Sequence, residues 1–251
     1  MNTFLRLIAS ATILFSRPAI AAVVEYTVDS SASFVTVSGT FQGSPFTDQI
    51  PGSSTAHYSG SFRCELENGL LDIVGHEAIS LFNPLPLAPT APNGNDEPSA
   101  YGFRVTLPDS SEVLISISSI SFYLSTNYHP PLDVADGFFA PSDLGFFLHG
   151  STLLLAGGTI PLAYADLHGS GAPNTAASPG TFTNDGILET LTIPIATTFS
   201  LDTLSPDDLT LTLALTGQIV ASRPVPEPST ALLLLCGGGL LFRNAGRRAR
   251  R

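Results

Sequence analysis

The sequence predicts an all-β fold, a β-sandwich of the Greek-key or jelly-roll type, between an N-terminal signal helix and a short C-terminal hydrophobic helix. Apolar residues recur at every second position in many segments of the body, whereas the periodicity of an amphipathic helix is nearly absent. Stretches rich in proline and glycine separate the alternating runs. A body of about two hundred residues is long enough to bury one full core, and a division into two sub-domains remains open.

The first segment, residues 1–21, has the layout of a secretory signal peptide. One early positive charge, Arg6, precedes the apolar stretch Leu7–Phe15. A helix-breaking proline follows, and then the small residues Ala19 and Ala21 in the spacing that signal peptidases cleave. We therefore expect export through the Sec machinery and cleavage after Ala21.

The body, residues 22–224, contains the alternating runs that predict strands. The clearest is 209–219, where leucines alternate with threonine and alanine, and 101–107 alternates aromatic and aliphatic residues with polar ones. In 113–124 the apolar phase changes, which predicts a β-bulge near Ser118 and Ser119. Further strands are expected at 23–29, 34–41, 57–66, 70–74, 145–155 and 187–199.

Two stretches of the body are rich in turn-forming residues. Residues 83–99 contain five prolines, and residues 169–186 contain four glycines. Both are expected to be long loops, and the first is a candidate hinge between two sub-domains.

Charge is distributed very unevenly along the chain. There are no lysines, and residues 23–224 contain three arginines against 20 of the 21 acidic residues, a formal charge of −17. A surface of this sign repels phosphate backbones, so no nucleic-acid partner is expected. The composition suits a soluble extracytoplasmic domain.

The body contains a single cysteine, Cys64, and therefore no internal disulfide is expected. Cys64 lies in the apolar phase of an alternating run, which predicts that its side chain faces the core. Recognisable hydrolase and phosphate-loop motifs are absent, and the five histidines are scattered without ligand spacing. We predict that the protein is not an enzyme and needs no cofactor.

Acidic and aromatic residues leave two binding hypotheses open. The closest carboxylate groupings are 96–97, 207–208, and Asp133 with Asp136, all in turn-like sequence. Oxygen ligands in the 127–143 loop make Asp133 and Asp136 weak calcium candidates, and the same carboxylates are the residues a surface hydrolase would need. Nearby aromatic residues form a candidate sugar-stacking platform, although core packing is expected for both phenylalanines: Tyr123, Tyr128, Phe138 and Phe139.

The last segment, residues 225–251, has three ordered parts. The motif 225–229 contains Pro226, Glu227 and Pro228, whose prolines fix an extended backbone. An apolar stretch, 230–242, is expected to engage the membrane as a short helix through Ala231, Leu232, Leu233, Leu234, Leu235, Leu240, Leu241 and Phe242. The tail 243–251 is expected to stay cytoplasmic because of its positive charges: Arg243, Arg247, Arg248, Arg250 and Arg251.

The apolar stretch is short for a membrane span. The uncharged run Ser229–Phe242 has 14 residues. At about 1.5 Å per residue it covers about 21 Å, less than a hydrocarbon core of about 30 Å. It is therefore expected to be a weak or transient anchor.

This order of motif, hydrophobic stretch and arginine cluster resembles the PEP-CTERM sorting signal. The resemblance implies a Gram-negative-type bacterium that makes exopolysaccharide or biofilm, with exosortase as the processing partner. It also implies a protein that is held at the inner membrane, transiently or finally, before it reaches the cell surface or extracellular matrix. Our leading hypothesis is a structural or adhesive surface protein; the alternatives are a carbohydrate- or calcium-binding module and a surface hydrolase.

Overall fold

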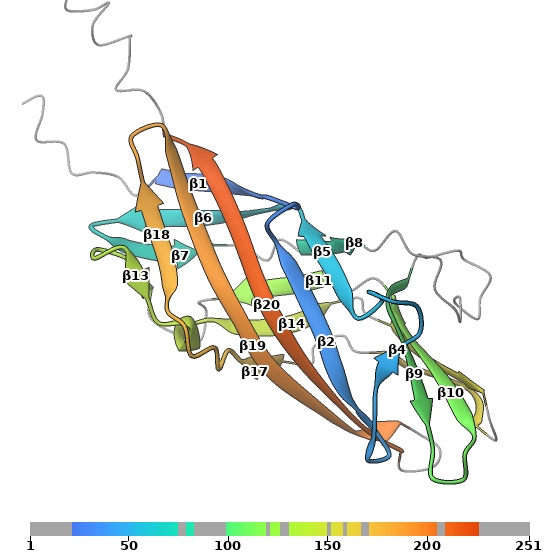
Figure 1. Cartoon of the computed structure of the whole chain (residues 1–251). Helices are drawn as coiled ribbons and strands as arrows, with labels where there is room; N and C mark the ends of the chain where they lie inside the picture. Colours follow the sequence, from blue (N-terminus) through green and yellow to red (C-terminus); the bar gives the residue numbers. More distant parts are fainter. Residues whose placement is uncertain are drawn as a thin grey trace, which may run out of the picture.

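The computed structural model describes residues 22–74, 79–82, 99–118, 121–125, 131–149, 152–157, 160–166, 171–204 and 209–225. These residues form strands β1 to β20 and one short 3₁₀ turn, η1 (Pro141–Asp143) (Figure 1). The predicted all-β fold is confirmed. The two expected helices at the ends of the chain lie outside the described residues.

Most strands belong to one large sheet. Its main path runs β12-β7-β6-β1-β20-β2-β5-β8-β11-β14-β17, and all the pairings along this path are antiparallel. The bounds of these strands are β1 Ala22–Val28, β2 Phe34–Phe41, β5 Thr55–Ser59, β6 Ser61–Glu67, β7 Leu70–Ile73, β8 Ile79–Phe82, β11 Ser121–Ser125, β12 Leu132–Asp133, β14 Gly145–His149, β17 Gly171–Pro173 and β20 Leu209–Pro224.

The last of the described strands, β20, lies in the middle of this sheet. Along one edge it pairs with β1 and β2, and along the other with β19, which is one residue longer (Figure 1). From β19 the sheet continues through β18 to β13, and β3 pairs with β2. The bounds of these four are β3 Ser44–Pro45, β13 Phe138–Phe139, β18 Gly180–Asn184 and β19 Leu188–Leu204.

The large sheet curves until its ends nearly meet. Just after β17, the backbone N–H of Thr175 donates to the Ala196 carbonyl of β19 at 2.6 Å. The Asn174 amide donates to the carbonyl of Pro194 at 2.8 Å and accepts from the N–H of Ala196 at 3.0 Å. One buried asparagine therefore joins the β17 end of the sheet to β19.

A smaller sheet has the order β16-β15-β10-β9-β4 and lies at the lower right of Figure 1. The buried side chains of both sheets form one hydrophobic cluster, in which Tyr101 and Phe103 of β9 join Phe41 of β2. The strands of the smaller sheet have the bounds β4 Thr47–Asp48, β9 Ser99–Thr106, β10 Glu112–Ser118, β15 Thr152–Gly157 and β16 Ile160–Asp166.

The strand predictions with strong alternation are confirmed. Leu211, Leu213 and Leu215 of β20 are buried, as the period-two pattern requires. Strand β2 spans the predicted residues 34–41. Cys64 is fully buried as expected, and burial raises the pKa of its thiol well above the usual range.

Other predictions are corrected. The register of β10 against β9 shifts between Ile117 and Ser118, next to the bulge predicted near Ser118 and Ser119. The phase change in 113–124 also marks a change of sheet, because β10 belongs to the small sheet and β11 to the large one. The predicted strand 145–155 divides in the same way into β14 and β15. The predicted loop 169–186 contains β17 and β18. Residues 83–98 lie outside the described residues.

Candidate functional site

The described chain ends where β20 passes into the C-terminal segment. Register pairs place Glu189 of β19 opposite Arg223 and Leu188 opposite Pro224. The N–H of Val225 still donates to the Ile187 carbonyl at 2.8 Å. The sheet therefore holds the backbone up to the residue that precedes the proline–glutamate–proline motif.

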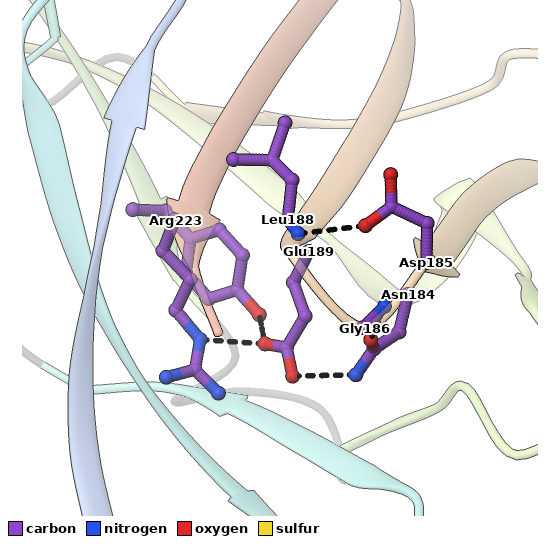
Figure 2. A network of polar contacts seen from close by, with 7 residues as sticks. Asn184, Asp185, Gly186, Leu188, Glu189 and Arg223 are labelled. Atoms are coloured by element: carbon purple, nitrogen blue, oxygen red, sulfur yellow. Dashed lines mark hydrogen bonds and ion pairs between the residues drawn. The ribbon is translucent and has the colours of Figure 1, made fainter. Parts of the chain in front are cut away.

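A partly buried polar network, centred on the buried residues Tyr26 and Glu189, holds this end of β20 (Figure 2). The Arg223 Nε donates to Glu189 Oε2 at 2.5 Å, and the Tyr26 hydroxyl from β1 donates to the same oxygen at 2.9 Å. The Asn184 amide of β18 donates to Glu189 Oε1 at 2.9 Å. We call these four residues the exit clamp, because they join β1, β18, β19 and β20 where the chain leaves the fold.

The electrostatics of the exit clamp favour a fixed, fully paired arrangement. The Glu189 side chain is only 6% exposed, and both of its oxygens accept hydrogen bonds. Burial raises the pKa of the Tyr26 phenol far above its usual value, and the Glu189 carboxylate acts in the same direction. The Arg223 guanidinium lies 5.6 Å from the centre of the Tyr26 ring, within the range of a cation–π contact. Glu189 is thus held in place by three side-chain donors.

The turn between β18 and β19 lies beside the clamp. Asp185 Oδ1 accepts from the N–H of Leu188 at 2.7 Å and from that of Ile187 at 2.8 Å, and these bonds hold the pKa of Asp185 below its usual value. Gly186 has a φ of 87°, a left-handed conformation that favours glycine. The turn is therefore well defined, yet it leaves the Ile187 side chain 78% exposed and that of Leu188 39% exposed.

Both ends of the body lie at the same end of the large sheet. Strand β1 is antiparallel to β20, with Thr27 opposite Ser222 and Val28 opposite Ala221. The start of β1 and the end of β20 consequently lie close together near the top of Figure 1. A signal peptide before Ala22 and a sorting segment after Val225 would leave the fold at one pole.

The predicted sorting residues themselves lie outside the described residues. This applies to Ala19 and Ala21, to Pro226, Glu227 and Pro228, and to the predicted membrane stretch 230–242 and arginine tail 243–251. Within the part of the chain that the structure describes, no helix is long and apolar enough to cross a membrane.

A second feature is an open hollow of about 620 Å³ beside η1. The structure brings Asp133 and Asp136 together with Asp143 in its wall, and it places Phe138 and Phe139 there as well. Phe139 is buried in the core as expected, but Phe138 is 59% exposed, so core packing was the wrong prediction for it.

The hollow is not arranged like a metal site. Asp133 Oδ1 accepts from the N–H of Ala135 at 3.1 Å, as an aspartate in a local turn does. Across the described ranges, no three or more histidine, cysteine or acidic side chains are grouped so that they hold a metal ion.

Other sequence candidates are dispersed or not described. His57 is exposed on β5, and His149 ends β14. His76, His129 and His168, the pairs 96–97 and 207–208, and Tyr128 lie outside the described residues, and the side chain of Tyr123 in β11 is not described.

Sequence reasoning missed the exit clamp. One signal was present in the sequence: Glu189 shares the inward phase of Leu191 and Ile193, so a carboxylate is expected on the buried face of the strand. Such a residue requires a partner, and Arg223 is one of only three arginines in residues 23–224.

The protein is all-β, and the exit clamp holds its strand β20 directly before the C-terminal segment. Residues 224–251 match the family model of the PEP-CTERM protein-sorting motif. No curated protein and no solved structure matches the chain significantly. The motif marks an exported protein that is targeted to exosortase and sorted to the cell surface.

Proposed function

We propose that this protein is a non-enzymatic surface protein with a structural or adhesive role, which exosortase delivers to the cell surface or exopolysaccharide matrix. The observation that carries the proposal is the sorting motif at 224–251, attached without a spacer to the clamped end of β20. We assign recognition by exosortase to Pro226, Glu227 and Pro228, transient membrane engagement to 230–242, and cytoplasmic retention to the terminal arginines.

The geometry at the end of β20 supports this assignment. Val225 is held by the Ile187 carbonyl, and Pro226 has no N–H with which to continue the ladder. The described pairing of β20 with β19 thus reaches the residue just before the one where recognition would begin. This held strand leads directly into the proposed recognition motif.

The proposal that the body is not an enzyme has its own support. The most buried carboxylate among the described residues, Glu189, is fully occupied by three donors. Asp133, Asp136 and Asp143 line a hollow that is open to solvent rather than a closed cleft. A hydrolase that uses two carboxylates needs both of them poised around a bound substrate.

The test is mass spectrometry of the protein from its native host. With Glu227→Ala, export and removal of the signal peptide should continue, whereas C-terminal processing should stop, as it should in a host that lacks exosortase. Ser229→Ala is the matched control, because it alters the same segment and leaves Pro226, Glu227 and Pro228 in place. A Glu227→Ala protein with the mature mass of the wild type would overturn the proposal.

A second candidate function, carbohydrate binding, is favoured by the hollow beside η1. Exposed Phe138 offers a ring for stacking on a sugar face, and Asp133, Asp136 and Asp143 offer acceptors for hydroxyl groups. Phe138→Ala should weaken retention on exopolysaccharide from the host without lowering the melting temperature. Leu70→Ala, at another exposed apolar side chain, is the control. Equal retention of the wild type, Phe138→Ala and Leu70→Ala on the exopolysaccharide would contradict carbohydrate binding at the hollow.

A further inference from the structure

Exposed apolar side chains gather where the chain leaves the fold. Ile187, at 78%, is the most exposed large apolar residue within the described ranges, and Leu188 follows it in the same turn. Val23, 53% exposed, lies near the start of β1, which is antiparallel to β20 and therefore begins at the end of the sheet where β20 finishes. We call Val23, Ile187 and Leu188 the exit pole.

Local structure does not explain why these residues are apolar. The turn is set by Asp185 and Gly186, and the main-chain groups of Ile187 take part in it while its side chain points into solvent. Single exposed apolar residues are common on protein surfaces. Three at one pole, where the described chain ends at Val225, indicate a contact surface.

The length of the connecting chain sets how near this pole lies to a membrane. Four residues lead from Val225 to Ser229, where the uncharged stretch begins, so the link spans at most about 14 Å. The headgroup layer on each side of the hydrocarbon core is about 5–7 Å thick. Engagement of 230–242 in the bilayer therefore holds the exit pole within reach of the headgroup region.

Charge determines which kind of contact fits. Residues 23–224 have a formal charge of −17, so an anionic lipid surface repels the body as a whole. A stable contact must therefore come from apolar side chains at the tethered pole, and salt should strengthen it by screening the repulsion.

We propose that Ile187 and Leu188, with Val23, seat the exit pole on the lipid interface while the C-terminal segment is engaged in the membrane. This inference rests on the proposed function, because it requires the sorting segment to hold the chain at a bilayer. The occupant of the surface is the lipid headgroup and upper acyl region, and the contact fixes the height of the motif above the membrane.

The chain contains no tryptophan, so a single introduced tryptophan reports on one place only. Ile187→Trp, in the full signal-processed chain, is reconstituted into phosphatidylglycerol-containing vesicles with or without brominated acyl chains. Brominated lipid should reduce the emission of Trp at 187. Val23→Trp provides a second reporter at the same pole. Thr210→Trp, at an exposed site at the opposite end of β20, is the matched control and should keep its emission.

Vesicle flotation separates the two possible failures. A chain that floats with the vesicles while Trp at 187 and at 23 keep full emission would refute the lipid contact and leave the proposed function standing. A chain that does not float would refute membrane engagement by 230–242, and the contact with it. Quenching at 187 that rises with salt, in a chain that floats, supports the inference.

Discussion

Arg223 and Glu189 form an ion pair of a kind that is costly to disturb. Their side chains are 13% and 6% exposed, and the carboxylate is satisfied by Tyr26 and Asn184 as well. Desolvation opposes charge on Arg223, but its bonds to Tyr26 and Glu189 outweigh this and hold the pKa of the guanidinium above its usual value. Loss of one partner leaves the other charge buried without a counter-charge.

We predict that Arg223→Ala lowers the free energy of unfolding by about 3–5 kcal/mol, because Glu189 then lacks its counter-charge. Arg104→Ala is the control. Its pair with Glu112 has both side chains 47% exposed, and such surface pairs contribute about 0–1 kcal/mol. Urea unfolding of the two variants measures the difference. Equal losses would show that the exit clamp contributes no special stability.

At the scale of elements, the pairing of β2 with β20 depends on two glycines. A Cβ added at Gly217 would lie 2.1 Å from the Phe34 carbonyl oxygen, and one at Gly39 would lie 2.0 Å from that of Thr212. In both cases the obstacle is backbone, which cannot turn aside as a flexible side chain does. The two strands therefore approach each other in a way that only glycine permits at these positions.

Gly217→Ala should accordingly destabilise the fold by at least about 1–3 kcal/mol, the usual cost of overpacking, since β2 and β20 must separate to admit the methyl group. Thr216→Ala, at the adjacent exposed position, should have little effect. Thermal unfolding followed by circular dichroism compares the two. A Gly217→Ala protein as stable as Thr216→Ala would contradict the close approach of the strands.

Sequence patterns predicted the elements whose burial alternates along one uninterrupted strand. In β2, β9 and β20 one face packs on the core, so the apolar period appears directly in the sequence. The crossings from β10 to β11 and from β14 to β15 were missed because a change of sheet and a bulge produce the same change of phase. Strands β17 and β18 were missed because glycine- and proline-rich sequence normally marks a loop.

The candidate site also has one part that the sequence could predict and one part that it could not. The sorting motif is linear, so its prolines, apolar run and arginines could be recognised from their order alone. The exit clamp joins Tyr26 to Glu189 across 163 positions of the chain. No local pattern encodes such a contact, since only the pairing of β1 and β19 with β20 brings the residues together.

At the scale of the whole molecule, buried tyrosine hydroxyls with raised pKa values determine how stability falls at high pH. Burial raises the pKa of Tyr26, Tyr58 and Tyr101 far above the ordinary value near 10. The folded state therefore keeps protons that the unfolded chain releases. The stability that these buried hydroxyls contribute is complete below the pKa that tyrosine has in the unfolded chain. It is lost as the pH rises above that pKa.

The melting temperature should thus respond little to these groups near neutral pH and fall steadily above about pH 10, where unfolded tyrosines ionise. Near-ultraviolet absorbance of phenolate should rise together with loss of the circular dichroism signal. The chain has six tyrosines, so a phenolate signal that corresponds to all six while the sheet signal persists would contradict the burial of these three hydroxyl groups.

We also predict that the folded body requires no metal ion. Treatment with EDTA, followed by added calcium, should leave the melting temperature unchanged, because the described aspartates beside η1 are not grouped as a metal site. A rise in melting temperature that depends on calcium concentration and is abolished by Asp136→Ala would show instead that Asp133 and Asp136 bind calcium.

The placement of β20 bears on how the chain crosses the membrane. Its neighbours β1, β2 and β19 all precede it, so their shared edges stay open until the final strand arrives on the outer side. Completion of the large sheet is therefore expected to be a late event of export, because its central pairings become available only when this strand has crossed. Since the sorting motif directly follows the strand, closure of the sheet and arrival of the motif at the membrane should fall close together in time.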